Sequence, residues 1–192
     1  PSGELVFKHR YAAPADGAPF TARITARIGA ESHTIAIIGV TPRYRVTVSD
    51  VQFSPLIHCD TSVEEYTEWK VERGVNGLVP WREWRFDRLT QPAVVVGDWL
   101  PQFEAIPGSG FSVDLKASDH VEVVYHAVEI DPVLDEILTH ERADLNPLQG
   151  NRSVSLTSYA DWGQPSCRVE YRFDIGVKLL TPGMDTGPVA TQ

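Results

Sequence analysis

The chain has 192 residues and a formal net charge of −9, with 42% hydrophobic and 22% charged residues. This composition is typical of a folded protein that can bury a full core, and it excludes a disordered chain. An acidic balance without a basic cluster excludes a dedicated nucleic-acid binder, which needs cations to neutralise phosphates. The longest apolar run is far too short to span a bilayer, so no membrane insertion is expected.

Arginine supplies most of the positive charge in this sequence. Four of the 17 basic residues are lysines, namely Lys8, Lys70, Lys116 and Lys178. An acidic, lysine-poor composition is typical of a halophilic protein, and a GC-rich genome would give the same arginine bias, so both interpretations stay open. No basic-then-apolar leader opens the sequence, so we expect a complete chain made in a cytoplasm and not exported. Cys59 and Cys167 are expected to be reduced and buried, and their pairing is left open.

The first part of the chain shows a series of short strand patterns. Residues 4–9 predict a short strand, and a Pro/Ala/Gly-rich linker completes an N-terminal arm over residues 1–19. Apolar residues alternate with Thr and Arg over residues 20–28, which predicts a half-exposed strand. Residues 33–40 contain a continuous apolar run, which predicts a more buried strand, and residues 44–53 alternate again.

The middle of the chain is also read as strands. Residues 63–73 carry acidic residues on both faces and fit helix or strand, and their aromatic and β-branched residues favour strand. Residues 78–88 hold an unusual mixture of aromatic residues and arginines. Residues 92–96 predict a short β-branched strand, and residues 102–106 lead into the next element.

Residues 108–130 have the pattern around which the predicted fold is arranged. Apolar and polar residues alternate over residues 111–115 and again over residues 121–130, with a polar turn at residues 116–119. This pattern predicts a β-hairpin with one buried face. The second strand is partly apolar on its other face too, which is typical of a central strand in a sandwich or barrel.

Residues 131–145 give the one helix that the sequence predicts. Asp131 is a suitable N-cap and Pro132 suits the first helical position, while Asn146 and Pro147 end the segment. The expected apolar face consists of Val133, Leu134, Ile137 and Leu138.

The last part of the chain contains the most regular alternation. Residues 154–158 predict a strand, and residues 168–179 predict a long strand with one buried and one solvent-exposed face. Residues 181–192 are interpreted as a C-terminal tail that needs a partner to become ordered. The whole pattern predicts an all-β fold, an antiparallel jelly-roll sandwich or barrel with one short inserted helix, formed by a single domain over residues 20–180.

The histidines do not predict a metal site. His120, Glu122 and His126 share one strand face, but the two histidines lie roughly 20 Å apart at the rise of an extended strand. A site at His120 and Glu122 would need a third ligand such as His58 or Cys59. His58 and Cys59, followed by Asp60, are adjacent and cannot easily face each other as base and nucleophile, and no glycine elbow or oxyanion loop flanks them. We therefore expect neither a metal, nor a cofactor, nor an enzyme.

The aromatic and arginine cluster of residues 81–88 is the predicted interface. Trp81 and Trp84 are three residues apart, so on a regular strand only one of them can enter the core. The predicted interface residues are Trp81, Arg82, Trp84, Arg85, Phe86 and Arg88. The alternatives are a bulged strand folded over the core and glycan stacking on Trp69, Trp81 or Trp99.

Four features of the chain are relevant to a family resemblance: the run IPGSGFSVDLKASDHVEVVYHAVEI, the chain length, the missing leader and the lysine-poor acidic composition. In these features the chain resembles the single-jelly-roll capsid proteins of icosahedral viruses with an internal membrane, including those that infect halophilic archaea. The resemblance covers residues 20–180. It implies upright barrels and a second, related capsid protein as a partner. A phage head-decoration protein would share nearly all of these features.

The sequence therefore leads to one expected function and two alternatives. The expected function is a virion structural protein, a capsid subunit that assembles with copies of itself into an icosahedral shell and is located in the virion. The alternatives are a carbohydrate-binding β-sandwich used for attachment and a cupin-like metalloenzyme.

Overall fold

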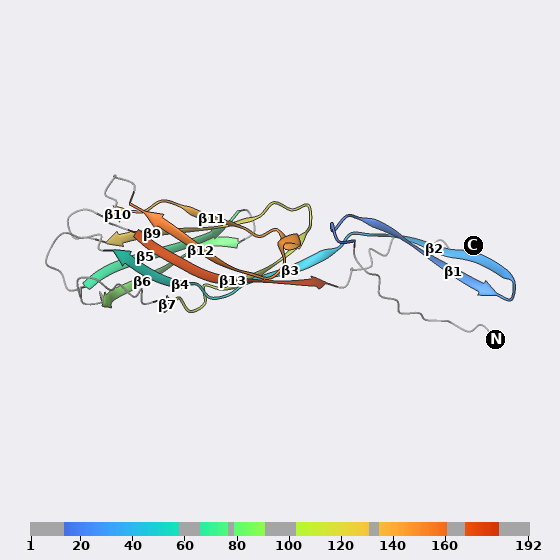
Figure 1. Cartoon of the computed structure of the whole chain (residues 1–192), viewed down its shortest axis with the longest axis horizontal. Helices are drawn as coiled ribbons and strands as arrows, with labels where there is room; N and C mark the ends of the chain where they lie inside the picture. The colour runs from blue at the N-terminus through green and yellow to red at the C-terminus, as the bar shows by residue number, and fades with distance from the viewer. Residues whose placement is uncertain are drawn as a thin grey trace.

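The computed structural model describes residues 14–57, 66–76, 79–90, 103–130, 135–160 and 168–180. In this part of the chain two β-sheets form a sandwich, and one long hairpin extends from an end of the sandwich (Figure 1). Every strand pairing between the described elements is antiparallel. The prediction of an all-β antiparallel sandwich is confirmed.

The first sheet has five strands in the order β10-β9-β5-β6, and β11 also pairs with β9. The strands are β5 (Tyr66–Val75), β6 (Val79–Thr90), β9 (Glu122–Ile130), β10 (Glu136–Ile137) and β11 (Glu141–Asp144). As its sequence predicts, β9 is central, and its residues from position 123 to 129 are buried on both faces.

The second sheet has six strands in the order β7-β4-β13-β3-β8, and β12 pairs with β13. The strands are β3 (Arg43–Val48), β4 (Gln52–Ile57), β7 (Glu104–Ala105), β8 (Phe111–Lys116), β12 (Arg152–Tyr159) and β13 (Arg168–Leu180). One edge of β13 pairs with β12, and the other pairs first with β4 and then with β3. A short 3-10 helix, η1 (Pro147–Gln149), precedes β12.

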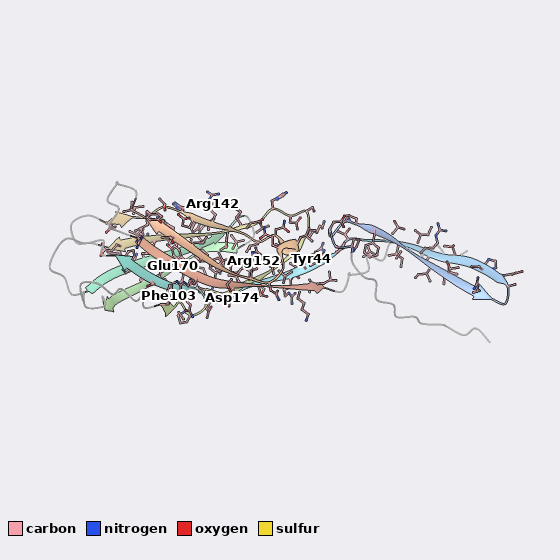
Figure 2. The ribbon with its side chains drawn as sticks, in the orientation of Figure 1. Tyr44, Phe103, Arg142, Arg152, Glu170 and Asp174 are labelled. Atoms are coloured by element: carbon pink, nitrogen blue, oxygen red, sulfur yellow. The ribbon has the colours of Figure 1, made fainter. Side chains whose placement is uncertain are left out.

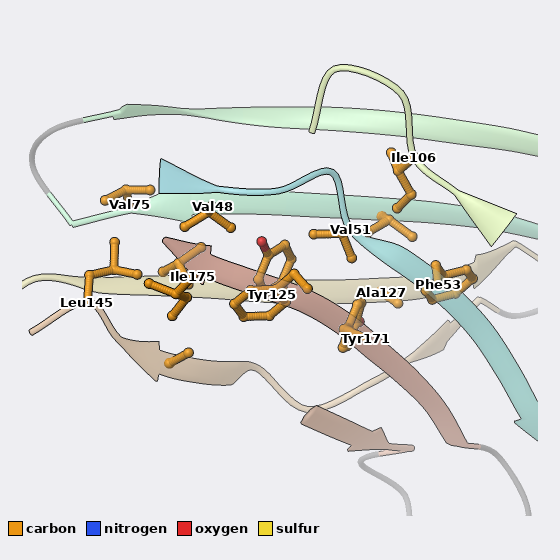
Figure 3. Packing of buried hydrophobic residues seen from close by; sticks show 14 of the residues in the cluster. Val48, Val51, Phe53, Val75, Ile106, Tyr125, Ala127, Leu145, Tyr171 and Ile175 are labelled. Atoms are coloured by element: carbon orange, nitrogen blue, oxygen red, sulfur yellow. The ribbon is translucent and has the colours of Figure 1, made fainter. Parts of the chain in front are cut away.

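The core between the two sheets is rich in aromatic side chains (Figure 3). Trp69 from the first sheet meets Phe53 from the second, with ring centroids 5.5 Å apart. Tyr125 of β9 stacks on Tyr171 of β13 at 5.3 Å. These contacts join the two sheets, so the inward-facing aromatic side chains stabilise the packing of one layer on the other.

The predicted helix over residues 131–145 is wrong. The described part of this segment contains β10 and β11, which both pair with β9. Leu138 also forms a bridge with Ala160, and its neighbour Thr139 donates its N–H to the carbonyl of Tyr159 at 2.8 Å. The segment therefore satisfies backbone groups at the edges of both sheets, which a helix would leave unpaired.

Within the described ranges, no helix is both long and apolar enough to cross a membrane.

The predicted hairpin over residues 108–130 is also wrong in its pairing. Its two strands exist as β8 and β9, but β8 pairs with β3 in one sheet and β9 pairs with β5 in the other. The connection between them therefore crosses the sandwich. Alternation shows which face of a strand is buried, and both strands bury a face in the same core, so the pattern does not identify the pairing partner.

Several sequence predictions lie outside the described residues. These are the strand at residues 4–9, the strand at residues 92–96, the C-terminal tail at residues 181–192, and the state of Cys59 and Cys167.

Candidate interaction surfaces

The hairpin formed by β1 (Phe20–Ile28) and β2 (Glu31–Val40) lies apart from the sandwich over most of its length (Figure 1). Strands of nine and ten residues make it about 30 Å long at the usual rise of a strand. Among the described strands, β1 and β2 pair only with each other. Because a two-stranded hairpin alone is marginally stable in water, we expect it to gain stability from further contacts.

A tight turn at Gly17 fixes the base of the hairpin to the sandwich. Gly17 has a φ of 64°, and its N–H donates to the carbonyl of Pro14 at 2.9 Å. A Cβ at Gly17 would lie 2.3 Å from the Cβ of Ala117 and 3.2 Å from Leu148. Both the left-handed backbone and the close approach require glycine, so this position determines how the hairpin leaves the body.

One face of the hairpin is cationic and exposes an apolar side chain. Arg23, Thr25 and Arg27 of β1 lie on this face, which we call the arginine face, and Ile37 of β2 lies opposite Arg23. The exposed fraction is 62% for Ile37 and 55% for Ile35, which lies at the β-bulge. The prediction of a more buried strand at residues 33–40 is wrong, because no second sheet covers these side chains in the described structure.

A polar groove on the outer face of the second sheet is the second surface. It has a volume of about 540 Å³ and lies over β4, β12 and β13. Two of its carboxylates, Glu170 and Asp174, follow one another along β13 (Figure 2). We call it the acidic groove, and its charged and hydroxyl side chains are Asp50, Glu170, Arg172, Asp174, Ser49, Ser153 and Ser155.

Two carboxylates of the acidic groove are exposed and are held in place by local hydrogen bonds. Asp50 accepts the N–H of Gly110 at 2.7 Å, and Asp174 accepts the hydroxyl of Ser153 at 2.6 Å. Each carboxylate can accept further hydrogen bonds. Both side chains are therefore positioned to bind a cationic donor from outside.

Glu170 is the less exposed carboxylate and is bound by Arg172. The Nε of Arg172 donates to one carboxylate oxygen at 2.7 Å, its Nη2 donates to the other at 3.2 Å, and the Ser155 hydroxyl also donates to Glu170. The guanidinium lies 3.9 Å from the ring centroid of Phe103. Burial alone would raise the pKa of Glu170, but these hydrogen bonds outweigh it and lower the pKa below its ordinary value.

We expect the pKa of the Glu170 carboxyl in the folded protein to lie below the ordinary value of a glutamate. Because the unfolded chain has the higher pKa, the resulting stability is fully present above that ordinary value and is lost as the pH falls through the lowered one. Carboxyl-detected NMR over an acid titration measures the midpoint. Arg172→Met should shift the midpoint upward, and an unchanged midpoint would show that Arg172 does not stabilise the carboxylate.

The two tryptophans of the predicted interface lie on opposite faces of β6, as their spacing predicts. Trp84 is partly buried and packs against the core, whereas Trp81 is 56% exposed. Trp81 lies over Gly74 of β5, where a Cβ would come within 2.5 Å of the indole ring. One aromatic ring of the pair therefore remains on the surface.

The other predicted interface residues are only partly described. Arg82 and Arg85 are exposed, and the Nε of Arg85 donates to Glu83 at 2.7 Å. The side chains of Phe86 and Arg88 lie outside the described part of the structure. An interface at this surface remains a prediction.

His126 lies on the outer face of the first sheet, where Glu72 and His140 surround it. Its Nδ1 is 3.0 Å from a carboxylate oxygen of Glu72, and its ring stacks on His140 with centroids 4.2 Å apart. Parallel stacking places the two rings in different planes, so they cannot both direct a nitrogen at one ion. His126 therefore completes the covering of β9.

His120 and Glu122, the other two residues of the histidine set, lie at the start of β9. His120 is exposed and precedes β9, and Glu122 pairs with Arg142 at 3.3 Å. Among the described residues no group of three His, Cys, Asp or Glu side chains is arranged to hold a metal ion. His58 and Cys59 lie outside the described ranges.

Comparisons with known proteins identify no family. No family and no curated protein matches the sequence. Among solved structures, the C2 domain A of plant Extended Synaptotagmin 1 has a TM-score of 0.45 and 14% identity over 73% of this chain and 98% of that domain. Human GIVD cytosolic phospholipase A2 has a TM-score of 0.45 and 10% identity over 74% of this chain, which spans 18% of that protein. A further C2 domain has a TM-score of 0.35 and 8% identity over 69% of this chain and 98% of that domain.

The expected function as a viral capsid subunit is wrong. The similar structures named above are C2 domains and a phospholipase, not capsid proteins. The physical basis of the expectation also fails in part, because the run that carries the resemblance predicts one hairpin, whereas its two strands belong to two different sheets. The proposed location in a virion and the related capsid partner remain untested predictions.

The hairpin's role and the acidic groove were missed by sequence reasoning. Arg23 and Arg27 alternate with apolar residues, but this pattern does not show that a strand leaves the body. Asp50, Glu170 and Asp174 come from distant segments. The one local signal is the alternation of charged residues from Glu170 to Asp174. It predicts a solvent-exposed strand face but does not predict that this face forms a groove.

Proposed function

We propose that this chain is a non-catalytic association module that joins copies of itself through the β1–β2 hairpin. The observation that carries the proposal is a hairpin held away from its own sandwich (Figure 2), with Ile35 and Ile37 more than half exposed. Covering these side chains removes apolar surface from water, which favours association. Self-association of this kind needs neither a shell nor icosahedral symmetry.

A second copy of the chain is favoured as the partner by charge. The hairpin carries two arginines and one glutamate, whereas the whole chain has a formal net charge of −9. The sandwich of another copy is therefore acidic where the hairpin is basic. Opposite charges speed encounter and orient the partners, and exposed apolar side chains then supply contact area.

Ile35→Thr combined with Ile37→Thr should weaken self-association at least tenfold. Threonine is β-branched, so it retains strand propensity while it removes apolar surface. Light scattering and sedimentation equilibrium of the full chain compare each mass with the 21.3 kDa monomer over a concentration series.

Ile137→Thr is the matched control, because Ile137 is an exposed isoleucine of β10 on the sandwich. This variant should associate like the wild-type chain. If the wild-type chain remains a monomer at every concentration, or if the control loses association as much as the hairpin variant, the proposal is wrong.

A further inference from the structure

We propose that the acidic groove of one copy receives the arginine face of the β1–β2 hairpin from a second copy. This inference rests on the proposed self-association and names the surface that the hairpin contacts. The occupant is a cationic β-strand face, and the receiving site is the groove over β4, β12 and β13.

The two surfaces are complementary in charge. The groove has three carboxylates, from Asp50, Glu170 and Asp174, and one cation, Arg172. Arg172 is already bound by Glu170, whereas Asp50 and Asp174 are exposed and hold only local donors. A guanidinium presents several N–H donors in a fixed plane, which suits the free oxygens of these carboxylates.

The two surfaces also agree in spacing. Arg23 and Arg27 are four residues apart on one face of β1, and Glu170 and Asp174 are four residues apart on one face of β13. Each pair therefore spans about 13 Å along an extended strand. One alignment of the strands brings one arginine over the exposed Asp174 and the other over Glu170, whose carboxylate already accepts hydrogen bonds from Arg172 and Ser155.

The residue midway between the charged pairs also fits this alignment. Thr25 lies between the two arginines, and Arg172 lies between the two carboxylates. The guanidinium of Arg172 would then face a hydroxyl instead of a third arginine. Its contacts with Glu170 and Phe103 hold the Arg172 guanidinium in place on the groove.

The contact must form between copies because the hairpin points away from its own sandwich (Figures 1 and 2). The turn at Gly17 and the buried base fix this direction. A hairpin bound to the groove of a neighbour is a head-to-tail contact, in which the two partners use different surfaces. Such a contact produces a ring or an open chain.

Charge reversal tests the assignment with two full-length variants. The arm variant carries Arg23→Glu and Arg27→Glu, and the groove variant carries Asp50→Lys and Asp174→Lys. Each variant alone should associate at least tenfold more weakly than the wild type. An equimolar mixture should regain association, because reversed arm meets reversed groove and native arm meets native groove.

The readout is fluorescence-detected sedimentation of differently labelled variants, and circular dichroism with thermal unfolding checks each fold. If the double groove variant does not fold, Asp174→Lys alone replaces it in the same mixture. Glu122→Lys, at a half-exposed position on the other sheet, is the control and should not change association. Raising the salt concentration should weaken wild-type association, because screening acts on exposed charges.

The outcomes separate this inference from the proposed function. A wild-type chain that never associates overturns both. If the wild type associates and the arm variant does not, while the groove variant behaves as wild type, the groove is the wrong receptor and the hairpin proposal stands. Loss in both variants without recovery in the mixture also overturns the pairing of these two surfaces.

Discussion

Trp69→Ala should lower the free energy of unfolding by roughly 4 kcal/mol. Trp69 is fully buried, and its ring contacts Phe53 of the opposite sheet at a centroid distance of 5.5 Å. Alanine would remove the largest buried side chain of the first sheet and leave a cavity that the neighbouring rings can fill only in part. Urea-induced unfolding, monitored by circular dichroism and by the remaining tryptophan fluorescence, measures the loss.

Trp81→Ala is the matched control for this prediction. Trp81 is 56% exposed on the outer face of the same sheet, so its removal should change the free energy of unfolding by no more than about 1 kcal/mol. Comparable losses in the two variants would contradict the assignment of Trp69 to the core and Trp81 to the surface. The same comparison argues against Trp69 as a glycan-stacking residue, because a buried ring presents no face to a ligand.

The elements that could be predicted from the sequence are those whose burial follows a local period. β13 alternates core residues such as Tyr171 and Ile175 with exposed Arg172 and Asp174, and the structure repeats this pattern along the strand. β9 carries apolar residues on both faces and lies in the middle of its sheet. In both strands the local pattern of apolar and polar residues is enough to predict which faces are buried, and the partner strand need not be known.

Pairing and direction could not be predicted, because they depend on distant segments. The spacing of Leu138 from other apolar residues predicts a helix, yet Ala143 and Leu145, which are two residues apart, are both buried as in a strand. This segment forms β10 and β11, which both pair with the edge of β9. In β2, Ile35 and Ile37 look like core residues in the sequence but lie on a hairpin that leaves the body.

The interaction surfaces show the same division. The spacing of Trp81 and Trp84 was sufficient to predict that one ring stays outside. The acidic groove depends on the pairing of β13 with both β4 and β12, which places Asp50 and Ser153 near Asp174. The sequence pattern of a single strand does not indicate which strands pair with it. A groove formed by three strands therefore could not be predicted from the sequence.

Arg73 is the most buried charged residue among the described residues. It is 1% exposed, and its Nη1 donates to the carbonyl of Ser109 at 2.6 Å. The guanidinium lies 4.5 Å from the ring centroid of Phe111 and 5.5 Å from that of Trp84. Burial lowers the pKa of Arg73, and its Nε has no hydrogen-bond partner among the described residues. The long side chain therefore stabilises the fold through packing while its charge carries a desolvation cost.

Arg73→Ala should lower the free energy of unfolding by roughly 3 kcal/mol, because it leaves a cavity beside Phe111 and removes the donor to the Ser109 carbonyl. Arg73→Met should cost about 1 kcal/mol, since methionine fills most of the volume without a buried charge. Urea unfolding of both variants at neutral pH measures the difference. If Arg73→Met is as unstable as Arg73→Ala, the hydrogen bond and the cation–ring contacts outweigh packing at this position, and the desolvation argument is wrong.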